Sequence, residues 1–97
     1  MKGIIAGDLN AEGSYVSKKN LKDLKLRLDK RFTWQIEDEV DTTVGATDCA
    51  YDRIITAGSC TEHACNADVY RFDEILNLNN EQAKQISDHY PVTININ

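Results

Sequence analysis

The hydrophobic positions of this chain form short runs that are separated by polar turns. Three of these runs, at residues 2–6, 50–57 and 92–96, contain β-branched residues and predict strands. A fourth run, at residues 31–36, alternates apolar and polar positions and predicts a short strand or an extended segment. All four runs have the length that is typical of strands in small domains.

Three helices are expected between these strands. Leucines recur at helical spacing after Ser17, which predicts a helix over residues 18–25 with Ser17 as its cap. Short helices are also expected at residues 72–76 and 80–86, and Pro91 then requires a turn because it disfavours a helical residue before it. The remaining polar stretches are expected to be loops: residues 37–48 and 58–68.

This order of elements predicts α/β (α+β) content without the regular alternation of a doubly wound fold. About four strands are expected to form one mixed or antiparallel sheet, with the helices on one face. The strands at residues 2–6 and 50–57 are apolar on both sides, as is typical of a sheet covered on both faces. The 97 residues form one domain or part of one, and the helices of this chain suffice for one face only.

Charge is unevenly distributed along the chain. The net charge is -5, yet residues 18–31 alone carry +5. The acidic balance argues against non-specific nucleic-acid binding, whereas the basic segment leaves local binding open; a solvated helix face explains the same charges. No apolar run approaches the roughly 18 residues of a membrane span. Residues 1–7 are too short for the apolar region of a signal peptide, so the sequence assigns no compartment.

The three cysteines are an odd set. Cys60 and Cys65 flank four residues that include His63, and they can form a disulfide, remain free thiols or bind a metal ion. Cys49 has no evident partner.

Three small clusters of polar residues stand at strand ends or turns. Asp8 and Asn10 follow the first strand, Asp52 lies at the start of the third, and Asp88-His89 precedes the last. Carboxylates suit a hard cation such as Mg²⁺, an amide can donate a hydrogen bond to a phosphate oxygen, and a neutral histidine held by a carboxylate can take a proton from water. The set predicts metal-assisted phosphate hydrolysis.

Each cluster also has a purely structural interpretation. Asp8 and Asn10 are typical of a turn in which side chains cap backbone groups. Asp52 could simply pair with Arg53, and the segment from Ser87 to Pro91 could be a helix stop followed by a turn.

Taken in order, five sequence blocks resemble the C-terminal part of the deoxyribonuclease I family, within the wider endonuclease/exonuclease/phosphatase fold. The blocks are GDLNAEGSYV, FTWQI, DTT, CAYDRI and ISDHYPV, and the resemblance runs over essentially all 97 residues. GD-x-N and SDH are shared across the wider group, whereas SYV, DTT and CAYDRI favour the deoxyribonuclease branch over phospholipid or other phosphate-ester hydrolases.

The resemblance implies a four-layered α/β/β/α sandwich of which this chain supplies the C-terminal part, about two-fifths. It implies that residues 1–97 are a partial domain whose N-terminal half is absent. That half carries the family's metal-binding glutamate, a second catalytic histidine with its carboxylate partner, and a DNA-contacting arginine. Members are commonly secreted, so the parent protein is expected to be secreted too.

By resemblance, His89 is a catalytic histidine, Asp52 orients it, and Asn10 binds the scissile phosphate. Asp8 and Asp88 belong to the Mg²⁺ and water network. Further residues match positions that contact the DNA backbone: Tyr15, Thr43 and Thr47.

A loop that begins with Asp41 and Thr43 binds structural Ca²⁺ in some members. Gly45 stands where a further threonine ligand is expected, although backbone carbonyls could serve instead. Cys49 matches a cysteine whose usual disulfide partner is replaced here by Gly13, so the resemblance implies a free thiol.

The expected function is therefore that of a divalent-metal-dependent endonuclease that hydrolyses DNA phosphodiesters, in a part that is inactive alone. Its partners would be DNA, contacted mainly through the backbone, and the N-terminal half or a second chain, without a membrane. The alternative is a non-catalytic half-domain that acts as a protein- or nucleic-acid-interaction module through its exposed apolar sheet face.

Overall fold

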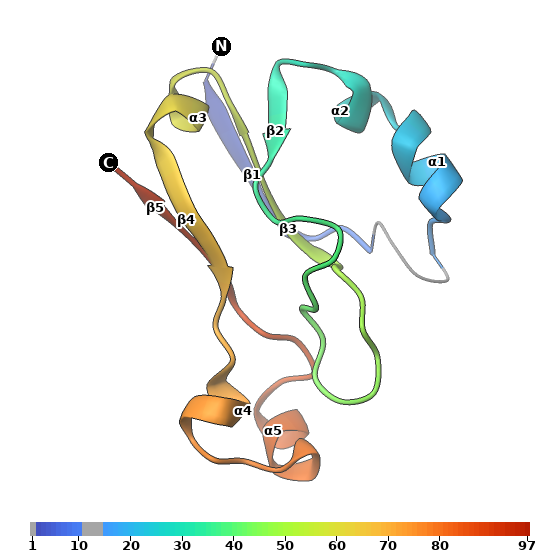
Figure 1. The fold of residues 1–97 in the computed structure, drawn as a ribbon, viewed down its shortest axis with the longest axis vertical. Helices are drawn as coiled ribbons and strands as arrows, with labels where there is room; N and C mark the ends of the chain where they lie inside the picture. The colour runs from blue at the N-terminus through green and yellow to red at the C-terminus, as the bar shows by residue number, and fades with distance from the viewer. Residues whose placement is uncertain (1, 11–14) are drawn as a thin grey trace.

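A computed structural model describes residues 2–10 and 15–97, and Figure 1 shows its elements. Gly13, which replaces the usual disulfide partner of Cys49 by resemblance, lies outside the described residues. The strands are β1 (Gly3–Asp8), β2 (Phe32–Trp34), β3 (Asp52–Ala57), β4 (Ala64–Val69) and β5 (Val92–Ile96). The helices are α1 (Lys18–Asp23), α2 (Lys25–Leu28), α3 (Ser59–His63), α4 (Phe72–Ile75) and α5 (Asn80–Ile86). The mixed α/β content predicted from the sequence is confirmed.

The described strands form two antiparallel sheets, so the prediction of a single sheet is wrong. One sheet has the order β1-β3-β2 and the other pairs β4 with β5. The error arose at residues 58–68, which were expected to be a loop but form α3 and β4. The polar residues of this segment gave no strand signal. In the structure, the register of β4 is irregular between Cys65 and Asp68, and Asn66 has a positive φ.

The short helices lie around the sheets in two places. In Figure 1, α1 and α2 lie beside β2, on the side away from β4 and β5, while α4 and α5 form a lobe beyond the ends of the strands. Ser17 caps α1 as expected, because its side chain accepts a hydrogen bond from the Asn20 amide at 3.1 Å. Asn79 and Gln82 form a capping box at the start of α5.

Two groups of buried residues stand out. The first follows β3, where Ile54, Ile55 and Ala57 are buried. The second holds the helical lobe together, and its buried members are Val44, Phe72, Ala83 and Tyr90. In that lobe Tyr90 donates a 2.7 Å hydrogen bond to Asp73, which satisfies the one polar atom of a buried ring.

A buried arginine ties the loop after β2 to β3. Arg53 is fully buried and donates to the carbonyl oxygens of Ala50 and Ile36, both at 2.7 Å, and to Asp38 at 2.9 Å. Arg27 also binds Asp38, at 2.8 Å. Burial by itself would raise the pKa of Asp38, but the hydrogen bonds from Arg53 and Arg27 outweigh it and lower that pKa. Asp38 is therefore one carboxylate partner of Arg53 among the described residues.

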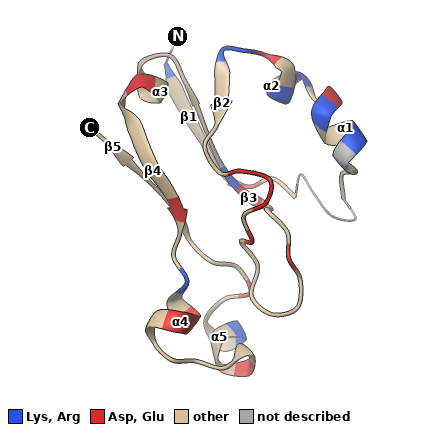
Figure 2. Cartoon of the chain, viewed as in Figure 1, with Lys and Arg blue, Asp and Glu red and all other residues tan. Residues whose placement is uncertain are grey.

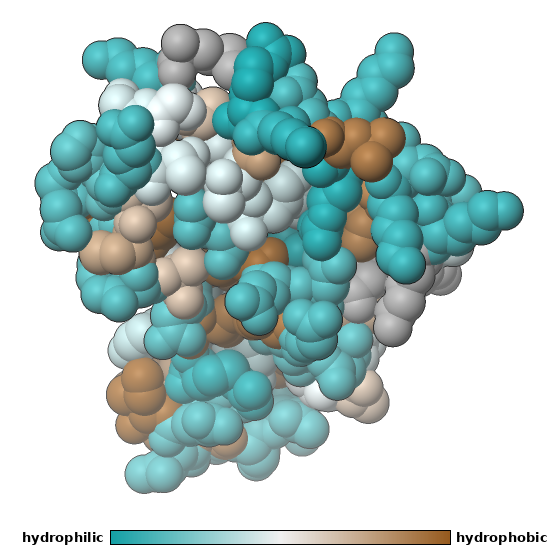
Figure 3. All heavy atoms as spheres, turned by 45° about the horizontal axis from the view of Figure 1, so that its top comes forward, coloured by the Kyte–Doolittle hydropathy of each residue, from teal (hydrophilic) through white to brown (hydrophobic). Residues whose placement is uncertain are grey.

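Charged and apolar side chains are segregated on the surface. Figure 2 shows lysine and arginine concentrated on α1 and α2, and acidic residues along the loop between β2 and β3. On the face drawn in Figure 3, apolar side chains form separate patches among hydrophilic ones. No helix in the described part of the chain is long and apolar enough to cross a membrane. Cys49, Cys60 and Cys65 are all free thiols in this structure.

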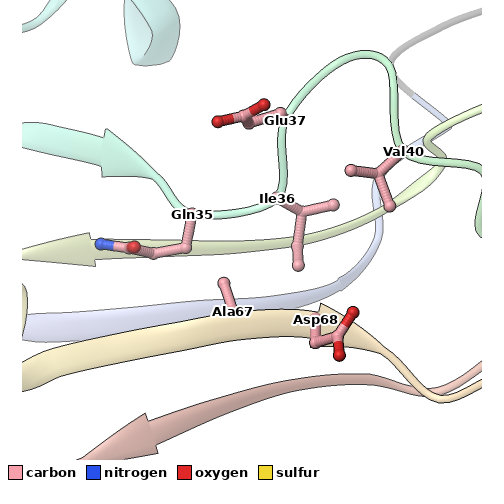
Figure 4. Close-up of a pocket in the computed structure, with 6 residues that line it drawn as sticks. All are labelled: Gln35, Ile36, Glu37, Val40, Ala67 and Asp68. Atoms are coloured by element: carbon pink, nitrogen blue, oxygen red, sulfur yellow. The ribbon is translucent and has the colours of Figure 1, made fainter.

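A small cleft of about 270 Å³ lies between the segment that follows β2 and strand β4. Figure 4 shows Ile36 and Ala67 pointing into the gap from opposite sides, with Asp68 beside them on β4. Gln35 extends along β3, where it donates to the Thr56 hydroxyl at 3.0 Å. This cleft shares no residue with the polar clusters that the sequence singled out.

Candidate active site

Two carboxylates meet at one end of the β1–β3 pair. Asp8 is the last residue of β1 and Asp52 the first of β3, and the antiparallel register places them directly opposite each other. Directly opposite residues share a face of the sheet, so two like charges stand together at a cost in stability. An arrangement of this kind is expected where the pair serves a site.

His89 is positioned by the loop that contains Thr42 and Thr43. The segment around His89 makes an isolated antiparallel bridge with Thr43. On either side of this bridge, the Tyr90 amide donates to the Thr42 carbonyl at 2.8 Å and the Val44 amide donates to the Asp88 carbonyl at 2.9 Å. The backbone therefore fixes the histidine against the end of β3.

The imidazole lies between the carboxylates. Its Nδ1 is 2.6 Å from Asp52 Oδ2, and its Nε2 is 3.9 Å from Asp8 Oδ2 and 4.0 Å from Asp88 Oδ1. Because a carboxylate can only accept, Nδ1 carries the proton of this hydrogen bond and Nε2 faces the other acids. Burial alone would lower the pKa of His89, but the Asp52 hydrogen bond and the charges of Asp52, Asp8 and Asp88 raise it above its usual value.

Thr42 fixes the backbone at Asp52 through hydrogen bonds. Its buried hydroxyl oxygen accepts hydrogen bonds from the amides of Tyr51 and Asp52, at 3.1 and 3.2 Å. The middle residue of the Asp41-Thr42-Thr43 motif is thus a positioning residue for the carboxylate that binds His89.

Asp8 and Asn10 form a turn as well as part of the site. The Asn10 amide donates to Asp8 Oδ1 at 3.0 Å, and Asn10 has a φ of 48°, a conformation that asparagine tolerates well. The structural interpretation of this pair is therefore correct, and the same turn brings the Asn10 side chain to the site.

A cleft of about 420 Å³ gathers these groups. It is lined by Asp8, Asn10, Tyr15, Thr43, Val44, Thr47, Tyr51, Lys84, Asp88 and His89. Seven of the nine residues predicted for the site line this cleft. The other two are not lining residues: Asp52 is hydrogen-bonded to the lining residue His89, and Asp41 is hydrogen-bonded to the lining residue Thr43. Residues separated by up to 81 positions in the sequence, from Asp8 to His89, thus share one surface.

Three further cleft residues were not predicted as site residues: Val44, Tyr51 and Lys84. Tyr51 lies with its ring centroid 5.6 Å from that of Tyr15 and 6.3 Å from that of His89. Its position beside Asp52 was the signal that could have identified it. Lys84 comes from α5, where a lysine in a short polar helix carries no sequence signal for a site.

The acidic part of the cleft fits a hard divalent cation. Ligand atoms of Asp8, Asp52 and His89 lie within 4.8 Å of one another, and Asp88 adds a carboxylate on the open side. Asp88 is 81% exposed and hydrogen-bonded to no other described side chain, so it is available to a ligand. Carboxylate oxygens are the donors that Mg²⁺ prefers.

The loop at residues 41–47 supplies only part of a Ca²⁺ shell. The Thr43 hydroxyl lies 2.8 Å from Asp41 Oδ1 and 2.6 Å from the Thr47 carbonyl oxygen, so three oxygens converge. Ca²⁺ takes six to eight oxygen ligands. Gly45 adds no side-chain oxygen, and the described part of the loop has a single carboxylate at this point.

Comparisons with known proteins place these residues in context. No family model matches the sequence. The chain is 41% identical over 96 residues to deoxyribonuclease-1 of Bos taurus, which is 96% of this chain and 34% of the bovine protein. It is 43% identical over 93 residues to deoxyribonuclease-1 of Gallus gallus, 93% of this chain and 33% of that protein. Deoxyribonuclease-1-like 2 of Homo sapiens is 41% identical over 96 residues, 96% of this chain and 32% of the human protein. The chain spans about a third of the length of the curated relatives that it matches.

Proposed function

Because the chain is a homologue of the C-terminal part of the deoxyribonuclease I family, as its sequence motifs predicted, we propose that it carries part of the active site of a divalent-metal-dependent endonuclease. The reaction is hydrolysis of DNA phosphodiester bonds. The observation that carries this proposal is the 2.6 Å hydrogen bond between His89 and Asp52, in a site that also gathers Asp8, Asn10 and Asp88.

His89 takes a proton from the attacking water. Asp52 holds the proton on Nδ1, which leaves the Nε2 lone pair directed toward the cleft. As the water is deprotonated, the imidazolium that forms is stabilised by the Asp52 carboxylate. Positioned proton transfer of this kind contributes about 10²–10⁴-fold to a rate.

The remaining cleft residues bind and orient the DNA backbone. Asn10 donates a hydrogen bond from its side-chain amide to the scissile phosphate, and Tyr15, Thr43 and Thr47 contact the neighbouring backbone. Contacts of this type go to phosphate and sugar, so the sequence preference should be weak. The fit of all four residues to one cleft supports this assignment.

Asp8 and Asp88 are the residues that would hold Mg²⁺. When bound, the ion would supply positive charge next to the phosphate as negative charge develops there. Each of the two carboxylates has an oxygen atom within 4.0 Å of the His89 Nε2 atom, so the same groups would orient the water that His89 deprotonates.

These 97 residues supply one histidine at the site, and His63 lies elsewhere, on α3. We therefore propose that efficient hydrolysis requires further elements of a four-layered sandwich, from a longer chain or a second polypeptide. Those elements would cover β1, whose six residues are all exposed in the structure. Alone, the chain should hydrolyse DNA slowly or not at all.

Complementation tests this proposal. The chain is joined to the N-terminal two-thirds of bovine deoxyribonuclease-1 and assayed for plasmid nicking with MgCl₂. The hybrid should nick DNA, and His89→Ala should lower its rate by about 10²–10⁴-fold. His63→Ala is the matched control and should leave the rate unchanged. An active hybrid in which His89→Ala has no effect would contradict the assigned role.

A second function is favoured by the exposed side chains of β1. Ile4 and Ile5 are 49% and 42% exposed on a strand at the edge of its sheet. Such an edge can pair with another protein, so the alternative is a non-catalytic interaction module. The mass of the chain in solution decides the matter: a well-dispersed monomer that binds no hydrophobic dye argues against an interaction module.

A further inference from the structure

Lys84 is the lysine in the candidate active site. It lies near the end of α5 and lines the cleft together with Asp88 and His89. Among the described residues that line the cleft, it contributes the one lysine or arginine side chain, whereas Asp8 and Asp88 contribute negative charge. The sequence motifs do not include it.

The Lys84 ammonium has no carboxylate partner in the described part of the chain. The ion pairs of this structure involve Arg27, Arg31, Arg53, Arg71 and His89, and none of them reaches Lys84. A solvated cation next to a substrate cleft is free to exchange water for an anionic ligand.

Gly45 provides the space that the Lys84 side chain uses. A Cβ atom at position 45 would lie 2.8 Å from Lys84 Cε, closer than real Cβ atoms approach, and 3.1 Å from Nζ, which is a tight contact. Gly45 also has a φ of 97°, which L-residues with side chains rarely adopt. The glycine therefore allows the end of the lysine to lie across the loop that carries Thr43 and Thr47.

We propose that Lys84 binds a backbone phosphate of DNA beside the scissile one. This inference rests on the proposed nuclease function and extends it to a residue that no motif assigns. An ammonium is a compact charge that suits a phosphate oxygen. In this position it offsets the repulsion between a polyanion and the acidic groups of the cleft. Lys84 thus contributes affinity for any DNA sequence, because phosphates carry no base information.

The salt dependence of DNA binding tests this role. The 97-residue chain is titrated into a short labelled DNA duplex, with EDTA present and NaCl varied, and fluorescence anisotropy gives the dissociation constant. Loss of one phosphate contact should reduce the slope of log affinity against log salt concentration by about 0.9. We expect Lys84→Met to show this reduction with weaker binding to every duplex, and Lys84→Arg to restore the slope.

Lys2→Met is the matched control, because Lys2 precedes β1 at the end opposite Asp8 and should leave the slope unchanged. Both methionine variants should keep the unfolding midpoint of the parent chain, since Lys84 is exposed and methionine is a good helix former. If the parent chain binds DNA and Lys84→Met retains its slope, or if Lys2→Met loses as much, the role of Lys84 is refuted while the nuclease proposal stands. If the parent chain does not bind DNA under any salt condition, the role of Lys84 is refuted as well, whereas the nuclease proposal is decided by the nicking activity of the hybrid and its His89→Ala variant.

Discussion

Two isoleucines that face each other across one pair of strands have opposite environments. Ile5 in β1 pairs in register with Ile55 in β3, yet Ile5 is 42% exposed and Ile55 is 1% exposed. Both strands are apolar and six residues long. The difference lies in their neighbours: β3 is the central strand, with β2 on its other side, whereas β1 is an edge strand in this structure. Apolar composition makes a strand, but only its position in the sheet buries it.

Strands β1 and β3 also differ at the candidate active site, where each contributes one carboxylate. Asp8 and Asp52 are opposite each other, and His89 is bonded to Asp52 and more distant from Asp8. The buried strand thus holds the tightly bonded carboxylate, and the exposed strand holds the one open to a ligand. Five predictions test these contrasts.

The largest effect is expected from the matched alanine variants of the two isoleucines. Ile55→Ala should lower the free energy of unfolding by about 2–5 kcal/mol, because it leaves a cavity in the core. Ile5→Ala should cost less than about 1 kcal/mol, as is usual for a partly exposed site. Urea denaturation measures both values. Equal losses would mean that β1 is covered in solution, by a second copy or another segment.

A smaller loss is expected when the buried arginine next to β3 is replaced. Arg53→Met removes the 2.7 Å hydrogen bond to the Ile36 carbonyl oxygen, and an unsatisfied buried group of this kind costs about 1–3 kcal/mol. Arg31→Met is the control, because Arg31 forms an exposed pair with Asp29 and its loss should leave the stability nearly unchanged. A thermal shift assay on the two variants would refute this contrast if the midpoints fell equally.

The bond between His89 and Asp52 predicts a dependence on pH. The native pKa of His89 should lie above the unfolded value of about 6.5, so its contribution to stability is complete below that value. The contribution is lost as the pH rises through the raised native pKa. In NMR titrations, Asp52→Asn should lower the pKa of His89, whereas Asp68→Asn, on the distant β4, should not. An unchanged pKa in Asp52→Asn would contradict the geometry.

The raised pKa of His89 also predicts how the hydrolysis rate depends on pH. His89 must be neutral to accept a proton, so the rate of a complemented nuclease should rise with pH through the raised pKa. A rate that falls over the same interval would show that the imidazolium is the active form.

The smallest effect is expected at the exposed acid of the strand pair. Asp8→Asn removes one of two like charges that face each other, and it should stabilise the chain by about 0.2–1 kcal/mol at a pH where His89 is neutral. The gain should shrink at high salt, because Asp8 is partly exposed. Destabilisation by this variant would mean that the Asp8–Asn10 turn outweighs the repulsion.

The sequence predicted most local elements, for reasons that individual residues make clear. Ser17 caps α1, and the runs at residues 50–57 and 92–96 contain β3 and β5. It missed β4, because polar Asn66 and Asp68 interrupt that strand and its partner β5 lies more than twenty residues away. It therefore also missed the second sheet. The four-layered sandwich stays a prediction.

At the site, the motifs around Asp8, Asp52 and His89 identified the groups that the structure brings together. The partner of Arg53 could not be found in this way, because Asp38 comes from a loop fifteen residues earlier. Lys84 was missed for a similar reason, since only the position of α5 beside Gly45 brings its ammonium to the cleft.

What the sequence determined by itself is the chemistry: which acids, amide and imidazole are present, and the family whose motifs they match. Short-range physics suffices for that, because motif spacing, helix caps and apolar runs act over a few residues. The tertiary structure alone decided which carboxylate bonds His89, which apolar strand is buried, and where Lys84 lies. These depend on the strand order and on the bridge between Thr43 and His89, contacts that form only when distant segments fold against each other.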